Sequence, residues 1–80
     1  MLIKFTKHAL ERLNSRNISK KLVIEILDNY DSIQKDNYGN FIAQKKKGAF
    51  LYRVFYSIKN EDKIVITAYK TSKVDKYKTK

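Results

Sequence analysis

The sequence contains no cysteine and a single histidine, His8. Without cysteine the chain forms no disulfide, has no thiol nucleophile and offers no thiolate to a zinc ion. One imidazole also falls short of the set that histidine-based metal sites use. Glycine occurs only at Gly39 and Gly48, so no glycine-rich phosphate loop or nucleotide-binding motif is present. We therefore expect no metal ion and no bound cofactor.

Long hydrophobic runs are missing as well. No apolar stretch approaches the roughly 18 residues that a membrane-spanning helix needs, and the N-terminus does not join a basic region to an apolar stretch of signal length. We expect a cytoplasmic protein without membrane association. The 80 residues contain no repeat and no linker, which predicts a single domain over 1–80.

Acidic side chains are scarce, with 8 against 18 basic residues and a net charge of +10. The excess is uneven, because residues 1–42 carry +2 and residues 43–80 carry +8. Such a field favours nucleic acid or an acidic protein as partner. The alternative is a lysine-rich composition that keeps a small protein soluble. Only Arg12, Arg16 and Arg53 are arginines, which suggests sites that use the bidentate guanidinium.

Two helices are expected near the N-terminus. Alternating apolar residues predict a short strand over 2–5, and Thr6 is placed to cap a helix over about 7–16. Ser19 is placed to cap a second helix that begins at Lys20, and its apolar residues follow a 3.6-residue spacing as far as Tyr30. Asp28, Asn29 and Asp31 favour turns and mark its end.

After residue 31 the spacing changes from 3.6 to 2, which predicts antiparallel strands. We expect strands over 32–35, 41–47, 50–58 and 64–69, with a turn at 36–40, a reversal at Gly48 and a polar hairpin loop over 59–63. Residues 70–80 either dock as one helical turn or fray as a basic tail. The order β-α-α-β-β-β-β predicts an α+β fold, with two helices packed on one face of an antiparallel sheet.

His8, Arg12 and Arg16 lie at i, i+4 and i+8 and therefore on one side of the first predicted helix, bordering its buried arc. At 1.5 Å per residue, His8 and Arg16 are about 12 Å apart along the axis, too far for all three to hold one phosphate. His8 is alternatively a helix-terminus packing residue. The two arginines alternatively pair with Glu25 or Asp28 of the second helix.

These residue types suit metal-free cleavage of RNA. The 2′-hydroxyl of the substrate is then the nucleophile, and the protein assists proton transfer and stabilises the charged phosphorane. A histidine with a pKa near neutrality transfers protons, and arginines bind phosphate oxygens.

Arg53 is the charged member of an otherwise apolar strand, on the opposite face from Tyr52, Val54 and Tyr56. A charge there is either paired or faces a cleft. We favour a groove beside the first helix over a buried ion pair.

Aromatic and lysine side chains add to this candidate site. Tyr52 and Tyr69 either stack a base or take part in ordinary sheet packing. The run Lys45, Lys46 and Lys47 is expected to form an electrostatic footprint that follows a nucleic-acid backbone.

Two stretches resemble known families. The N-terminal run 6–9 with Arg12, Arg16, Ile18, Ser19 and the 22–27 helix resembles a small bacterial family whose domains open with a His-x-x-x-Arg-x-x-x-Arg helix. The closing run 64–73, with Tyr77 beyond it, resembles the last strand of the same family and of the BrnT branch of RelE-like toxins. BrnT-like proteins tend to have arginine where this chain has Tyr69.

The resemblance implies a RelE-like, barnase-related fold with a curved sheet that carries the active groove. It also implies a type II toxin that cleaves RNA and is neutralised by an antitoxin encoded beside it. By matching position, the residues carried over are His8, Arg12, Arg16, Arg53 and Tyr69.

Our hypothesis is a metal-independent endoribonuclease that acts on RNA, including ribosome-bound mRNA, and binds an acidic antitoxin. The catalytic set is His8, Arg12, Arg53 and Tyr69. The RNA-binding set is Arg16, Lys45, Lys46, Lys47, Tyr52, Lys70 and Lys73. The alternative is a non-catalytic basic module that binds nucleic acid or an acidic protein without cleavage.

Overall fold

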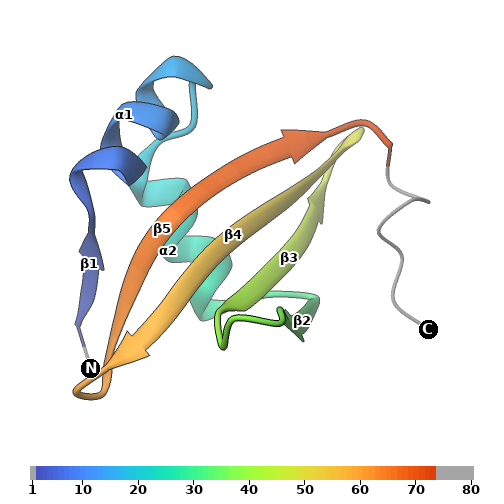
Figure 1. The fold of residues 1–80 in the computed structure, drawn as a ribbon. Helices are drawn as coiled ribbons and strands as arrows, with labels where there is room; N and C mark the ends of the chain where they lie inside the picture. Colours follow the sequence, from blue (N-terminus) through green and yellow to red (C-terminus); the bar gives the residue numbers. More distant parts are fainter. Residues whose placement is uncertain (1, 74–80) are drawn as a thin grey trace.

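The computed structural model describes residues 2–73, which form two helices and one five-stranded sheet (Figure 1). The elements are β1 (Ile3–Phe5), α1 (Lys7–Ser15), α2 (Lys20–Asp28), β2 (Ser32–Lys35), β3 (Phe41–Lys47), β4 (Phe50–Lys59) and β5 (Asp62–Thr71). The α+β class and the order β-α-α-β-β-β-β are those predicted from the sequence.

Both helices begin at the predicted caps. The hydroxyl of Thr6 accepts a hydrogen bond from the Ala9 amide at 3.0 Å, and the hydroxyl of Ser19 accepts one from the Leu22 amide at 3.1 Å. These bonds satisfy amides that have no partner inside the first helical turn. Helix α1 ends one residue before the predicted bound, because Asn17 takes a left-handed conformation at φ 60° and turns the chain.

The strands lie in the order β1-β5-β4-β3-β2. The pairs β2–β3, β3–β4 and β4–β5 are antiparallel, whereas β1 pairs with β5 in parallel. The expectation of an antiparallel sheet is therefore wrong for β1, and the sheet is mixed. A parallel pair needs a connection of a dozen residues or more. The chain between β1 and β5 includes both helices and three strands, so it is long enough to allow this pairing.

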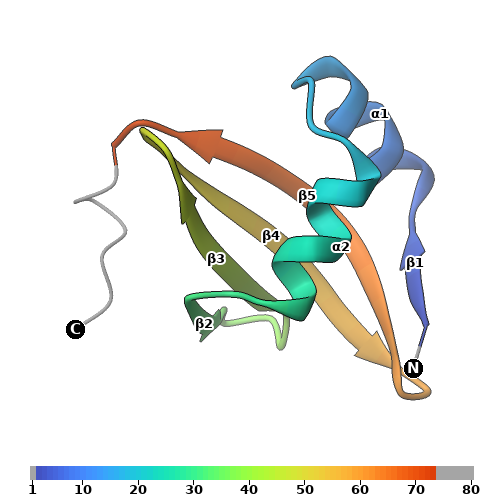
Figure 2. The ribbon, with the colours of Figure 1, turned by 180° about the vertical axis from the view of Figure 1, so that it is seen from behind.

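The helices cover one face of this sheet only. Helix α2 passes behind β4 and β5 in Figure 1 and in front of them in Figure 2. Between the helices and the sheet lies the core of Ala9, Leu13, Ile18, Val23, Ile26, Leu27, Ala43, Val54, Tyr56, Val65 and Ala68. The other face of the sheet carries no helix among the described residues, and we call it the open face. Its side chains alternate with those of the core.

The β4–β5 hairpin is longer and tighter than predicted. Its turn consists of Asn60 and Glu61 alone, with φ values of 52° and 69°, and Lys59 pairs with Asp62. The predicted five-residue loop is wrong because polar residues at an exposed hairpin end still form strand. Strand β5 also continues to Thr71, so the start of the predicted tail belongs to the sheet. Its remainder, 74–80, lies outside the described residues.

Candidate functional site

A row of four polar side chains crosses the open face, one from each of β2 to β5. Strand pairing places Ser32 opposite Gln44, Gln44 opposite Arg53, and Arg53 opposite Tyr69. Residues that pair directly across a sheet share a face. We call Ser32, Gln44, Arg53 and Tyr69 the polar row.

Hydrogen bonds run along the polar row. The amide nitrogen of Gln44 donates to Oγ of Ser32 at 3.1 Å, and Nε of Arg53 donates to Oε1 of Gln44 at 2.8 Å. The Nη1 group of Arg53 donates to the phenolic oxygen of Tyr69. From the neighbouring position on β2, Gln34 accepts a bond from Nη2 at 3.2 Å. Every nitrogen of the guanidinium therefore donates, which a buried charge requires.

Burial fixes this arrangement. Gln44 is 2% exposed and Arg53 is 8% exposed, and they are the buried polar side chains of residues 2–73. A guanidinium held by three side chains at such low exposure has little rotamer freedom. The open face consequently presents a charged group in one fixed orientation.

Two aromatic rings flank the guanidinium. The rings of Phe55 and Tyr69 stack with their centroids 6.0 Å apart. The Cζ atom of Arg53 lies 5.4 Å from the Phe55 centroid and 5.7 Å from the Tyr69 centroid. Both rings are half-buried on the open face. Rings next to a guanidinium are a surface on which planar groups can stack.

The predicted groove for Arg53 is corrected. The alternation itself is right, because Tyr52, Val54 and Tyr56 pack in or against the core beneath the helices. Arg53 therefore lies on the open face and not beside α1. Alternation along one strand assigns residues to two faces, but it does not say which face the helices cover.

Arg16 joins α1 to the edge of β5. Its Nη1 group donates to Oγ1 of Thr67 at 3.1 Å and to the carbonyl of Ala68 at 2.9 Å. Strand β1 pairs with β5 only as far as Val65, so this carbonyl lies at a sheet edge. Thr67 precedes Tyr69 by two residues on the open face. The guanidinium of Arg16 therefore borders the open face from the helix side.

His8 and Arg12 continue the same stripe on the exposed side of α1. The His8 side chain is 86% exposed, and its Nδ1 lies 3.9 Å from a carboxylate oxygen of Glu11. Arg12 is also exposed. The structure thus brings Arg53 and Tyr69 together and places Arg16 next to their strand. His8 and Arg12 lie on α1 in the helix layer, along the stripe that Arg16 continues to the β5 edge.

The lysine run splits between the two faces. Nζ of Lys45 donates to the Asn29 carbonyl at 2.9 Å, and Nζ of Lys47 lies 2.9 Å from Glu25. The hydrogen bond and charge of Lys47 hold the pKa of Glu25 below its ordinary value. Glu25 thus pairs with Lys47 and not with an arginine of α1. Lys46, between them, is exposed and alternates to the open face. Of the three lysines predicted to bind a nucleic-acid backbone, only Lys46 lies on the open face. Lys45 and Lys47 instead contact Asn29 and Glu25 at the C-terminal part of α2.

The remaining predicted binding residues lie apart from the polar row. Tyr52 pairs with Lys70 on the helix-covered face, and Tyr52 packs against the core. Nζ of Lys70 lies 5.0 Å from the ring centroid of Phe50. Lys73 is exposed just after β5. Of the two roles predicted for Tyr52, the structure shows packing within the sheet and against the core.

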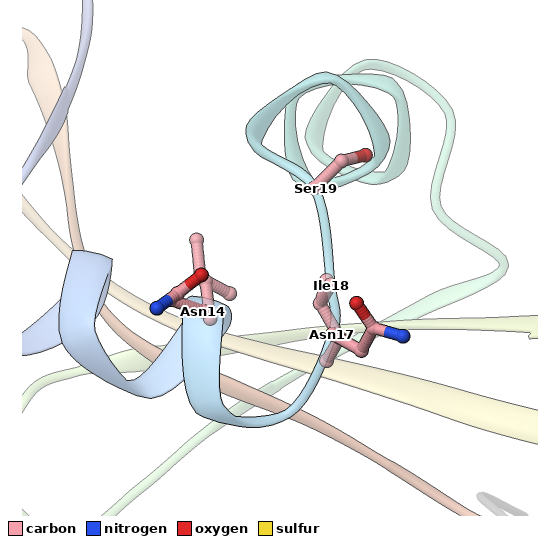
Figure 3. A pocket seen from close by; sticks show the side chains of 5 residues that line it. Asn14, Asn17, Ile18 and Ser19 are labelled. Carbon is pink, nitrogen blue, oxygen red and sulfur yellow. The ribbon is translucent and has the colours of Figure 1, made fainter.

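A hollow of about 260 Å³ lies at the connection between α1 and α2. It is lined by Leu13, Asn14, Asn17, Ile18 and Ser19. Figure 3 shows the side chains that line it. These side chains carry no charge, and the hydroxyl of Ser19 is engaged with the Leu22 amide as the cap of α2. The polar row thus remains the candidate site.

Sequence reasoning missed Gln34, Gln44 and Phe55. One signal was available, because Gly48 closes a tight hairpin in which Lys47 pairs with Phe50. Counting back from that pair places Gln44 opposite Arg53. A glutamine opposite an arginine between buried strands is a hydrogen-bonded pair.

Within residues 2–73, no helix has the length and apolar character needed to cross a membrane. No three histidine or carboxylate side chains among them gather in an arrangement that would hold a metal ion.

Comparisons with known proteins address the whole chain. Neither the curated proteins nor the solved structures gave a match. A family model described as a domain of unknown function, DUF4258, matches residues 5–70. The match runs from the last residue of β1 to the last residue but one of β5. Because this match covers most of the sequence, the chain belongs to the DUF4258 family.

Proposed function

We propose that the chain binds single-stranded RNA on the open face of its sheet and cleaves it without a metal ion, as the toxin of a toxin–antitoxin pair. The observation that carries this proposal is the fixed guanidinium of Arg53 beside the rings of Phe55 and Tyr69. The resemblance of the closing run 64–73 to the last strand of the BrnT branch of RelE-like toxins supports it.

The open face combines the two elements that single-stranded nucleic acids use. Bases stack on aromatic rings such as Phe55 and Tyr69, and phosphates bind cations along a groove. Lys46 on β3 and Arg16 at the β5 edge lie on either side of Arg53. The net charge of +10 favours binding of RNA, and of an acidic antitoxin.

Cleavage requires proton transfer as well as charge stabilisation. In this proposal the 2′-oxygen attacks phosphorus as its proton passes to a base, and Arg53 stabilises the pentavalent phosphorane. The bond from phosphorus to the 5′-oxygen then breaks as that oxygen takes up a proton, which leaves a 2′,3′-cyclic phosphate. The hydroxyl of Tyr69, hydrogen-bonded to Arg53, is the proton-transfer group nearest to that charge. His8 takes this role only where the RNA passes over the β5 edge onto α1, along Arg12 and Arg16. The two assignments make different predictions for variants of His8 and Tyr69.

A non-catalytic binding module is the second candidate. The open-face positions of β2 to β5 carry no histidine within residues 2–73, and the carboxylate there, Asp62, lies at the hairpin end of β5, where it binds the Leu2 amide and Lys4. A surface of arginine, glutamine and aromatic residues binds phosphates and bases without supplying a strong general base.

One experiment separates these functions. End-labelled single-stranded RNA is incubated with the purified protein in EDTA between pH 5 and 9. Endonucleolytic products ending in 2′,3′-cyclic phosphate are expected, and a substrate with 2′-deoxy sugars is expected to stay intact. Salt-dependent binding without cleavage would favour the binding module. Absence of both binding and cleavage would contradict the RNA proposal.

A further inference from the structure

Two glutamines hold the same guanidinium in different ways. Gln44 accepts from Nε of Arg53 at 2.8 Å, whereas Gln34 accepts from Nη2 at 3.2 Å. Gln44 lies on β3 inside the sheet, and Gln34 lies on the edge strand β2. The two residues have the same chemistry but differ in burial, in bond length and in the part of the guanidinium they contact.

Gln44 is fixed at both ends of its amide. Its nitrogen donates to Ser32 and its oxygen accepts from Arg53, and the residue is 2% exposed. Arg53 determines which end of the amide faces it, since a guanidinium only donates and only the oxygen of an amide accepts. The hydroxyl of Ser32 then accepts from the amide nitrogen. Because Gln44 engages Nε, the end of the guanidinium formed by Nη1 and Nη2 is directed toward Tyr69 and Gln34.

Gln34 is the more easily replaced partner. It is half-buried on a strand of four residues, and its bond to Arg53 is the longer of the two glutamine bonds. A phosphate oxygen carries negative charge, whereas the amide oxygen of Gln34 is neutral, so phosphate adds ion-pair attraction to the hydrogen bond with the guanidinium. The side chain of Gln34 can leave toward the sheet edge without disturbing the core.

We propose that Gln44 is the positioning residue of Arg53, and that Gln34 occupies the place that a phosphate oxygen takes when RNA binds. This inference rests on the proposed binding of RNA at the open face. It adds the subsite, namely the position of the Gln34 amide oxygen beside Nη2. It also assigns opposite effects to two glutamine-to-methionine substitutions in the same network.

The first test does not depend on RNA cleavage. The chain has three arginines, so their Nε–H resonances are few enough to assign by NMR. We expect the Nε–H of Arg53 to exchange slowly with water in the parent protein and in Gln34→Met, and fast in Gln44→Met. Inorganic phosphate is then expected to shift this resonance in the parent and at lower concentration in Gln34→Met. Equal exchange rates in the two variants would overturn the positioning role.

The second test measures affinity for a single-stranded RNA oligonucleotide. We expect Gln44→Met to bind about tenfold more weakly or worse, since it leaves the buried Nε–H without its acceptor. Gln34→Met is expected to bind as tightly as the parent or more tightly. If Gln34→Met lost as much affinity as Gln44→Met, the proposal that Gln34 occupies the place of a phosphate oxygen would be overturned.

A third variant keeps the inference testable if Gln44→Met fails to fold. Gln44→Glu retains an acceptor for Nε but adds a negative charge, so it should preserve slow exchange and still weaken RNA binding. Fast exchange in this variant would contradict the positioning role. If phosphate and RNA bind as expected but RNA is never cleaved, the nuclease function fails and the subsite stands. If neither phosphate nor RNA affects the Arg53 resonance in the parent, both fail.

Discussion

Arg53 and Tyr69 lie opposite each other on β4 and β5, and the guanidinium of the first donates to the phenolic oxygen of the second. In the proposed function, this pair combines a phosphate-binding charge with a proton-transfer group on one face of the sheet.

The first prediction concerns Tyr69→Phe. This change keeps the ring stacked on Phe55 but removes the hydroxyl, so RNA binding should stay within about threefold of the parent. If Tyr69 transfers the proton, the rate of cleavage at saturating RNA should fall by roughly 10² or more. Single-turnover cleavage assays measure this rate. A cleavage rate equal to that of the parent would remove Tyr69 from the catalytic set.

His8→Ala is the matched test on α1. Because the His8 side chain is 86% exposed, its loss should change the free energy of unfolding by no more than about 0.5 kcal/mol. A fall in cleavage in this variant would then be a direct effect on the reaction. We expect the larger loss in Tyr69→Phe, and the reverse order would place proton transfer on α1.

The lysine run should separate into binding and structural residues. Lys46→Ala removes an exposed charge on the open face and should lower the slope of log affinity against log salt by about 0.7. Lys47→Ala removes the partner of Glu25 and should raise the pKa of that carboxyl toward its ordinary value. Salt titrations of RNA binding and NMR titration of Glu25 measure the two effects. Equal salt slopes in the two variants would contradict this division.

Glu61→Gly should stabilise the protein. Glu61 has a φ of 69° in a two-residue hairpin turn, and two-residue turns with positive φ at both positions favour Asn-Gly. Removing the Cβ relieves strain that exceeds the added freedom of the unfolded chain, for a gain of about 0.5–1 kcal/mol. Urea denaturation measures the gain. Glu61→Ala is the control, because it keeps the Cβ and should show no such gain.

Asp62 should contribute to the loss of stability in acid. The backbone N–H of Leu2, and to a smaller extent Lys4, lower the pKa of Asp62 below its ordinary 3.8. A lowered carboxyl pKa stabilises the fold above the pKa of the unfolded chain, and this contribution is lost as pH falls through the folded pKa. Stability should therefore decline below about pH 3.8, and less steeply in Asp62→Asn. Thermal melts between pH 2 and 6 measure the difference. If the melting temperatures of the two proteins fell equally steeply below pH 3.8, Asp62 would not contribute to the loss of stability in acid.

The local signals in the sequence determined much of the fold. Thr6 and Ser19 cap the helices where their hydroxyls precede apolar residues at helical spacing. Alternation placed Arg53 on the face opposite Val54, and the strand at 41–47 has its predicted bounds. These features depend on residues within a few positions of one another, so the sequence contains their full physical cause.

Tertiary structure decided the site. The parallel pairing of β1 with β5 and the helix cover on one face arise from contacts between residues distant in sequence. Those contacts determine that Arg53 faces the open side with Gln44 and Tyr69, while His8 lies in the helix layer. The sequence by itself identified Arg53 and Tyr69 as candidate site residues. Only the packing of the helices on one face determined which of them meet, because burial and hydrogen bonding hold a guanidinium at one place in three dimensions.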